Sequence, residues 1–227
     1  MKRFRIFLPI LCIAGLCLQA RAASVALTFD DGPSPLTEEL LEILERENVP
    51  ATFFLNGYRI EEYPTACALF RGTRHELAVH GYSHGYMHRM TPEELTEEIA
   101  STRLLIMETT GKEPSLLRPP GGLSCCGVTE EAERQGLPII LWSVDPEDWK
   151  RGTLPKAVAD FVLSETRDGD IVLLHDLDRR TVEALPKILT ELKSRGFEFR
   201  TVSGLAAEFG VTLLPGVSYC RISSKAP

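Results

Sequence analysis

The chain has 227 residues, 44% of them apolar and 25% charged, a composition that suits one globular domain with a sizeable core. Its formal net charge is −7 at pH 7, and the first 22 residues hold four basic side chains and no acidic one. Without that segment, 21 Lys and Arg face 32 Asp and Glu, a balance that argues against a nucleic-acid partner. A neutral, cationic or extended polymer fits this charge better.

Residues 1–22 are expected to be a signal peptide. A basic start at residues 2–5 precedes the apolar run 6–18, which is short for a membrane span, and Ala20-Arg21-Ala22 is a typical cleavage signal. We expect cleavage after Ala22, a secreted, periplasmic or cell-envelope location, and no stable membrane insertion afterwards. The alternative is that the segment is retained as an anchor.

Short β-rich runs alternate with helical stretches over residues 23–210, which we expect to form a single domain. The runs span residues 25–29, 51–56, 76–80, 115–118, 138–145, 170–175 and 197–202. The amphipathic stretches include residues 36–47, 92–109, 154–166 and 181–195. Strands separated by helices pair in parallel, so the pattern predicts an α/β fold. Residues 211–227 are expected to be a C-terminal tail, which Cys220 could pin.

Polar side chains follow the predicted strands where each strand ends. They are Asp30, Asp31, His80, Arg118, Asp145 and His175. The strand ends of barrel-like α/β enzymes share one rim, where active sites are built. Taken alone, Asp30-Asp31-Gly32-Pro33 could be an ordinary turn. Two adjacent carboxylates at the end of a buried strand instead favour a metal site, because buried negative charge needs a cation.

Two histidines, His80 and His84, directly follow a predicted strand on this same rim. Neutral imidazoles are common metal ligands, and the H-x-x-x-H spacing lets both reach one ion if the loop folds back. The alternative is a pair of surface histidines. His75 and His88 are close in sequence, but we expect both to have surface roles.

Five ordered segments carry a family resemblance. They are Thr28 to Pro33, His80 to His84, Arg118-Pro119-Pro120-Gly121, Asp145-Pro146-Glu147-Asp148-Trp149 and Leu173-Leu174-His175. In order and spacing the chain resembles the polysaccharide deacetylase family, the NodB-homology domain of carbohydrate esterase family 4, over residues 25–210. The resemblance implies a distorted (β/α) barrel of about seven parallel strands.

The resemblance also implies one divalent metal, held by Asp31, His80 and His84. Three protein ligands leave positions open for water and a substrate oxygen. We expect zinc, although cobalt, iron or another divalent ion would also suit these ligands.

The catalytic residues implied by the resemblance are a base, Asp30, oriented by Arg118, and an acid, His175, which would protonate the leaving amine. Asp145 is expected to tune the pKa of His175 by pairing with its imidazolium. For an isolated histidine at a strand end, the alternative is a hydrogen-bonded core residue.

Three further residues are expected to bind the substrate. The backbone N–H of Gly121 would stabilise the oxyanion, and Trp149 and Leu173 would line a pocket for the acetyl methyl group, or alternatively pack in the core. Many relatives carry an aromatic residue at the Gly121 position. We therefore expect one wall of the cleft to be lost here, or rebuilt by the loop containing Cys125 and Cys126.

Four cysteines remain after signal cleavage: Cys67, Cys125, Cys126 and Cys220. In an exported protein we expect Cys125 or Cys126, or both, to pair with Cys67 or Cys220. A thiolate metal site is disfavoured, because paired C-x-x-C spacing is missing.

The expected function is hydrolysis of N-acetyl groups on amino sugars of an extracellular polymer, such as peptidoglycan or chitin-like N-acetylglucosamine chains. An O-acetyl xylan esterase would use the same residues. Two further readings are a hydrolase of small or cyclic amides and a catalytically silent carbohydrate-binding domain. The oligomeric state is left open.

Overall fold

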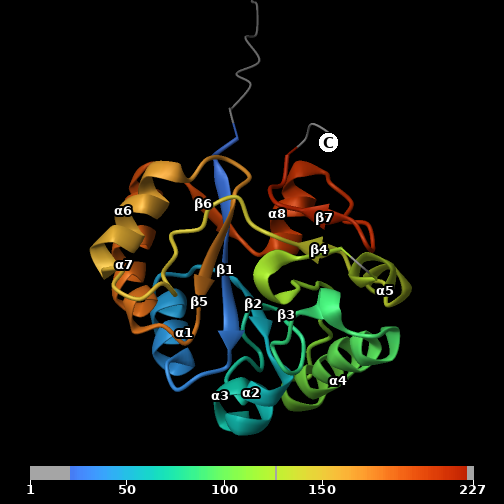
Figure 1. Ribbon diagram of the computed structural model, residues 1–227. Coiled ribbons are helices and arrows are strands. Elements are labelled where there is room, and N and C mark those ends of the chain that lie inside the picture. The colour runs from blue at the N-terminus through green and yellow to red at the C-terminus, as the bar shows by residue number, and fades with distance from the viewer. Residues whose placement is uncertain (1–20, 126, 224–227) are drawn as a thin grey trace, which may run out of the picture.

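The computed structural model describes residues 21–125 and 127–223 (Figure 1). The predicted signal segment therefore lies almost wholly outside the described residues, as does Cys126. The strands are β1 (Ser24–Gly32), β2 (Thr52–Leu55), β3 (Glu76–Val79), β4 (Ile139–Ile140), β5 (Ile171–His175), β6 (Glu198–Arg200) and β7 (Ser218–Tyr219). The helices are α1 (Thr37–Arg46), α2 (Gly57–Glu62), α3 (Pro64–Ala68), α4 (Pro92–Thr110), α5 (Val128–Arg134), α6 (Pro155–Glu165), α7 (Arg179–Ser194) and α8 (Val202–Phe209).

The long strand β1 stands at the centre of the molecule, with helices around it (Figure 1). It pairs in parallel with β2, β5 and β6, and β3 continues the sheet beyond β2. The predicted parallel α/β fold is confirmed. The registers place Asp30 beside His175 of β5 and beside Phe54 of β2, so residues far apart in sequence meet at one end of the sheet.

Single-residue bridges connect the two edges of this sheet. Leu117 bridges Val79 at the end of β3 and Ile139 in β4, and Val144 bridges Val172 in β5. The predicted strand over residues 115–118 thus contributes one bridging residue, and the one predicted over 138–145 shrinks to β4 and Val144. The described strands therefore form a strongly distorted barrel, in which no bridge joins β4 to Val144.

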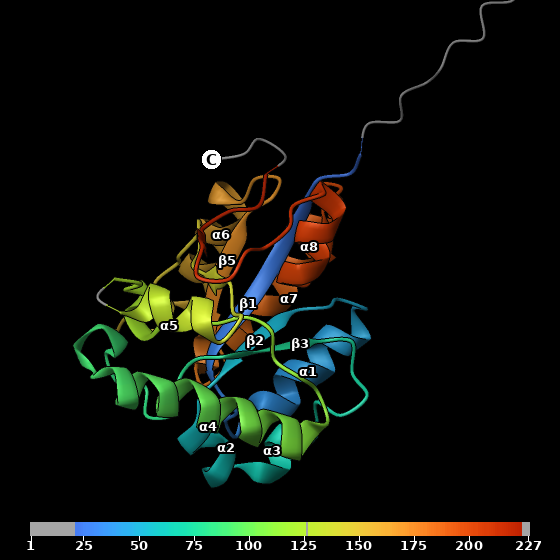
Figure 2. The ribbon, with the colours of Figure 1, turned by 90° about the vertical axis from the view of Figure 1, so that its right-hand side faces the viewer.

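Side chains alternate between two apolar clusters, as expected for strands packed on both faces. Phe53 belongs to the larger cluster under the surrounding helices, whereas Phe54 belongs to the smaller one. Leu205 of α8 also belongs to the smaller cluster. The helix α8 covers one end of the strands (Figure 2). A capping box at Thr91 starts α4, where the side chain of Thr91 accepts from the backbone N–H of Glu94.

The C-terminal segment differs from the predicted appendage. β7 pairs in parallel with β4, and the backbone N–H of Ile222 donates to the carbonyl of Gly169 at 2.8 Å. Ile222 is only 1% exposed, in the apolar cluster that Tyr219 also contacts. Residues 216–222 are therefore part of the packed body, because they cover apolar surface that the strands leave open.

Among the described residues, Cys67 and Cys220 are free thiols, so the expected disulfides do not form there, and Cys126 is outside this part of the chain. Cys67 is fully buried in α3, and burial raises the pKa of its thiol to about 12, so it behaves as an apolar core residue. Within residues 21–125 and 127–223, no helix is long and apolar enough to cross a membrane.

Candidate active site

A cleft of about 460 Å³ opens at the carboxyl ends of the strands. Nine of the ten site residues expected from the sequence line it, and the tenth, Arg118, lies directly behind Asp30. Two aromatic residues that the sequence did not indicate, Tyr86 and Trp142, complete the lining. The structure therefore brings the predicted residues together in one place.

The two carboxylates at the end of β1 differ in burial and in backbone conformation. Asp30 is buried, whereas Asp31 takes a left-handed backbone conformation with φ of 69°. The next residue, Gly32, has no room for a side chain, because a Cβ there would collide with the carboxylate of Asp176. Asp176 is buried directly after β5 and accepts hydrogen bonds from Ser34 and Thr37. Burial raises the pKa of Asp176 to about 6, despite these two hydrogen bonds.

Three potential ligands meet beside Asp30. One atom each of Asp31, His80 and His84 lies within 4.8 Å of the others, with His80 Nε2 3.3 Å and His84 Nε2 3.0 Å from Asp31 Oδ1. His84, like Asp31, has a positive φ, of 59°. Non-glycine residues in this conformation cluster at functional sites, where the surrounding structure must hold them.

The chemistry of these donors fits a divalent cation. His80 Nδ1 lies 2.7 Å from the carbonyl of Arg118 and donates to it, which leaves the lone pair of Nε2 facing Asp31. Asp31 Oδ1 is buried without a hydrogen-bond partner. Burial would raise the pKa of Asp31, but the two imidazoles hold it well below its usual range. A buried, ionised and unpartnered oxygen facing two imidazole nitrogens is what a metal ion would satisfy.

Arg118 is fully buried, and each of its hydrogen-bonding nitrogens has a partner. One terminal nitrogen donates to Asp30 Oδ1 at 2.6 Å and to the hydroxyl of Thr28 at 2.8 Å. The other nitrogens donate to the carbonyls of Ile140 and Leu141, both at 2.9 Å. Buried charges are tolerated when paired and hydrogen-bonded in this way, so Asp30 is fixed in one orientation.

The partner of His175 differs from the prediction. His175 Nδ1 lies 2.7 Å from Asp148 Oδ1, and the backbone N–H of His175 donates to Asp148 Oδ2. Asp145 instead accepts from the backbone N–H of Glu147, and the left-handed φ of 52° at Glu147 turns the chain so that Asp148 reaches His175. Asp148 thus replaces Asp145 as the partner.

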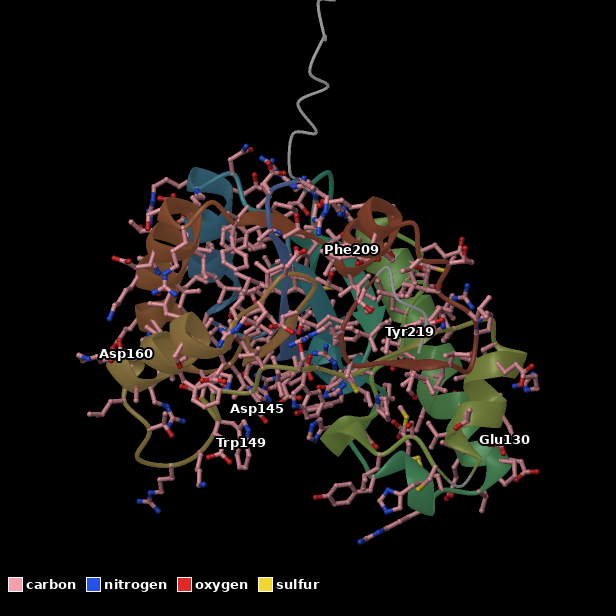
Figure 3. The ribbon with its side chains drawn as sticks, turned by 90° about the horizontal axis from the view of Figure 1, so that it is seen from above. Glu130, Asp145, Trp149, Asp160, Phe209 and Tyr219 are labelled. Carbon is pink, nitrogen blue, oxygen red and sulfur yellow. The ribbon has the colours of Figure 1, made fainter. Side chains whose placement is uncertain are left out.

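The electrostatic consequence falls on His175. Burial alone would lower the pKa of His175, but the hydrogen bond and charge of Asp148, with the charges of Asp30 and Asp31, raise it to about 9. Asp145 stays at the rim of the cleft, on the same loop as Trp149 (Figure 3), and burial raises its pKa as well. The imidazolium of His175 therefore persists at neutral pH.

The wall opposite this loop contains Gly121, whose φ of 72° favours glycine. A Cβ there would lie 3.3 Å from the ring of Tyr86. Tyr86, from the loop after β3, thus forms part of this wall of the cleft. Cys125 does not line the cleft, and Cys126 lies outside the described residues. Trp149 is 53% exposed at the rim and Leu173 is buried in the floor, so both face the cleft.

The other two histidines lie outside the cluster of ligands. His75 is buried rather than at the surface: its Nδ1 accepts from the backbone N–H of Ala51, and burial lowers its pKa to about 4. His88 is partly buried and packs against the ring of Tyr86.

Comparison with known proteins gives one consistent match. The family model described as polysaccharide deacetylase matches residues 19–140. The peptidoglycan-N-acetylglucosamine deacetylase PgdA of Listeria monocytogenes is 40% identical over 81% of this chain, but the chain spans only 39% of that protein. A peptidoglycan-N-acetylglucosamine deacetylase of Bacillus cereus is 39% identical over 80% of this chain and 87% of its own length.

A similar solved structure is the family 4 acetyl xylan esterase from Clostridium thermocellum in complex with a cobalt ion. It has a TM-score of 0.81 and 34% identity, over 87% of this chain and 98% of that one. Sequence, fold and the arrangement of the cleft therefore agree that this chain belongs to the polysaccharide deacetylase family.

Proposed function

We propose that this chain is a metal-dependent hydrolase that removes N-acetyl groups from amino sugars of an extracellular polysaccharide. One observation carries the proposal: a single cleft joins the potential metal ligands to a buried carboxylate and to a histidine that is paired with Asp148. The relatives named as peptidoglycan deacetylases make peptidoglycan the first substrate to test, with chitin-like polymers second.

Asp30 is the proposed base. Arg118 holds its Oδ1, while Oδ2 lies 3.6 Å from His80 Nε2, on the side of the ligand cluster. Oδ2 is thus placed to take the proton of a water that attacks the acetamide carbon. A divalent ion held by Asp31, His80 and His84, which we propose to be zinc, would acidify that water and polarise the carbonyl. The same donor set suits cobalt and iron.

His175 is the proposed acid. Asp148 fixes its Nδ1, so Nε2 is left to protonate the sugar nitrogen as the carbon–nitrogen bond breaks, releasing acetate and a free amine. The backbone N–H of Gly121 would stabilise the developing oxyanion, an interaction that is worth roughly 3 kcal/mol in other hydrolases. Trp149 and Leu173 would enclose the acetyl methyl group.

The test is acetate release from peptidoglycan, N-acetylglucosamine oligomers and acetylated xylan, using protein that begins at Ala23. We expect release from an amino-sugar polymer, lost with chelator, restored by zinc, and reduced about 100-fold or more in Asp30→Asn. Zinc content measured in the variant controls for loss of the metal. If no polymer is hydrolysed while metal is bound, the result would favour a hydrolase of small amides or a catalytically silent carbohydrate-binding domain.

A second candidate, O-acetyl xylan esterase, is favoured by the similarity to the xylan esterase of Clostridium thermocellum. The same cleft residues would act on an ester, with an alcohol as the leaving group. Acetate release from xylan alone would select this activity over the proposed one.

The names of the relatives also support an exported location, because peptidoglycan is a polymer of the cell envelope. We propose cleavage after Ala22. The mass of the mature protein recovered from envelope and medium fractions tests this site.

A further inference from the structure

A second hollow, which we call the acidic groove, opens beside the catalytic cleft. Its volume is about 890 Å³, compared with about 460 Å³ for the cleft, and it is within the range of ligand sites. It lies between α2, α4 and the loop after β3, and Figures 1 and 2 both show α2 and α4 as neighbours.

The charge of the acidic groove is strongly one-sided. Its walls carry Glu61 of α2 and Glu94, Glu97 and Glu98 of α4, against one cation, Arg89. The guanidinium of Arg89 lies 5.1 Å from the centre of the Tyr86 ring. Within the described residues, no salt bridge joins Arg89 to these carboxylates. The wall therefore attracts cations.

The floor of the acidic groove is apolar. Leu104 is 53% exposed and Tyr86 is 54% exposed, and both line the hollow. Exposed apolar and aromatic side chains beside polar walls are typical of surfaces that bind sugar rings or other amphipathic ligands, because a ring offers one apolar face.

The acidic groove and the cleft share a wall. Tyr86 lines both hollows, and its loop also carries the proposed ligand His84. Glu98 holds this loop: its Oε2 accepts from the backbone N–H groups of Tyr82 at 2.7 Å and Ser83 at 2.9 Å. The two hollows are therefore adjacent, on either side of Tyr86.

We propose that the acidic groove binds glucosamine units of the polymer that have already lost their acetyl groups. This inference rests on the proposed deacetylase function, because that reaction turns a neutral acetamide into a primary amine that carries positive charge when protonated. The carboxylates of α2 and α4 attract this charge, and Tyr86 and Leu104 contact the ring. Deacetylated stretches would thus hold the next acetylated unit at the cleft.

The experiment is a calorimetric titration of the zinc-loaded full chain carrying Asp30→Asn, so that no turnover occurs. Glucosamine oligomers and N-acetylglucosamine oligomers of equal length are compared at low and high salt. We expect the glucosamine oligomers to bind more tightly at low salt, with the advantage shrinking at high salt.

Two double variants, each added to the Asp30→Asn background, locate the binding. Glu61→Gln with Glu97→Gln removes two charges from the acidic groove and should weaken glucosamine binding roughly threefold to tenfold. Glu93→Gln with Glu108→Gln makes the same change in charge at exposed positions of α4 outside the groove, and should leave the affinity within twofold.

Equal affinity for both oligomers, or equal weakening by both double variants, would overturn the proposal. Preferential binding of a lysine-containing peptide over glucosamine oligomers would also overturn it. Acetate release by the protein with Asp30 restored is measured separately. Acetate release without preferential binding of glucosamine oligomers would refute only the proposed role of the acidic groove. Preferential binding without acetate release would refute only the proposed deacetylase function.

Discussion

The catalytic cleft and the acidic groove both carry carboxylates, but they hold them in opposite ways. In the cleft, Asp30 and Asp148 are buried, and each has a charged or polar partner in hydrogen-bond contact. In the groove, Glu61 and Glu97 lie on exposed helix surfaces. Charge in the cleft is thus part of the folded core, whereas the exposed charge of Glu97 can change with little effect on folding.

Replacing Arg118 by Met should cause the largest loss of stability, because it removes the cation that pairs with a buried carboxylate of the cleft. The variant leaves Asp30 buried without a cation, so we expect the free energy of unfolding to fall by about 3–5 kcal/mol. Urea unfolding measures this, and Arg46→Met, at an exposed position of α1, is the control, expected to change stability by less than about 0.5 kcal/mol. A loss for Arg118→Met as small as the control's would contradict the assigned pairing.

Removing the metal should affect activity rather than the fold. The three ligands stand on strand ends and a loop held by Glu98, so we expect chelation to lower acetate release about 1000-fold and zinc to restore it. His84→Ala should behave like the chelated protein, while His88→Ala, outside the ligand cluster, should respond to zinc like the unmodified chain. Undiminished release from protein shown to be free of metal would refute the metal dependence.

Asp148→Asn should shift the pH dependence. The pKa of His175 is raised to about 9, so its imidazolium is present below that pH and lost as pH rises through it. Without the charge of Asp148, this pKa should fall toward the ordinary value of about 6.5, and activity at pH 8 should drop by up to roughly thirtyfold. The same linkage makes the stabilisation from this pair complete below about pH 6.5 and lost through about pH 9.

Asp145→Asn is the matched comparison for Asp148→Asn, because its carboxylate lies on the same loop without contacting His175. The alkaline limb of the pH–rate profile should move less than in Asp148→Asn. A larger shift in Asp145→Asn than in Asp148→Asn would indicate that Asp145 is the partner of His175.

Changes in the acidic groove should have the smallest effect on stability. Glu97 is exposed, so we expect Glu97→Gln to alter the free energy of unfolding by less than about 0.5 kcal/mol. Urea unfolding beside the Arg118→Met series measures the contrast directly. A larger loss would mean that the groove, like the cleft, belongs to the stabilised core.

Asp31 and His80 could be placed from the sequence because they end or directly follow buried strands, whereas the ligand set with His84 came from the family resemblance. A run such as 171–174 is apolar enough to be read as a buried parallel strand, and parallel strands bring their carboxyl ends together. That rule places Asp31 and His80, whereas His84 lies in the loop after β3, with a positive φ, and reaches Asp31 from there.

Asp148 and Tyr86 could not be assigned in the same way. Asp145 and Asp148 stand three residues apart in one loop, and the left-handed turn at Glu147, which no strand pattern encodes, decides which one reaches His175. Tyr86 meets Gly121 through a contact between distant loops. β7 has only two residues, too few for a periodic signal.

The single-residue bridges at Leu117 and Val144 give the barrel of strands a seam. β1 has ladders to neighbouring strands along most of its length, whereas this seam depends on a few isolated pairs. The backbone amides at the seam are nevertheless hydrogen-bonded, with Leu117 donating to Pro138 at 3.0 Å and Leu173 donating to Val144 at 2.9 Å, and the bridging side chains are buried. These amides should therefore exchange with deuterium slowly, like those of β1. Because His80 directly follows Val79 and its Nδ1 donates to the carbonyl of Arg118, opening of this seam would displace a proposed metal ligand, so metal binding should slow deuterium exchange along it.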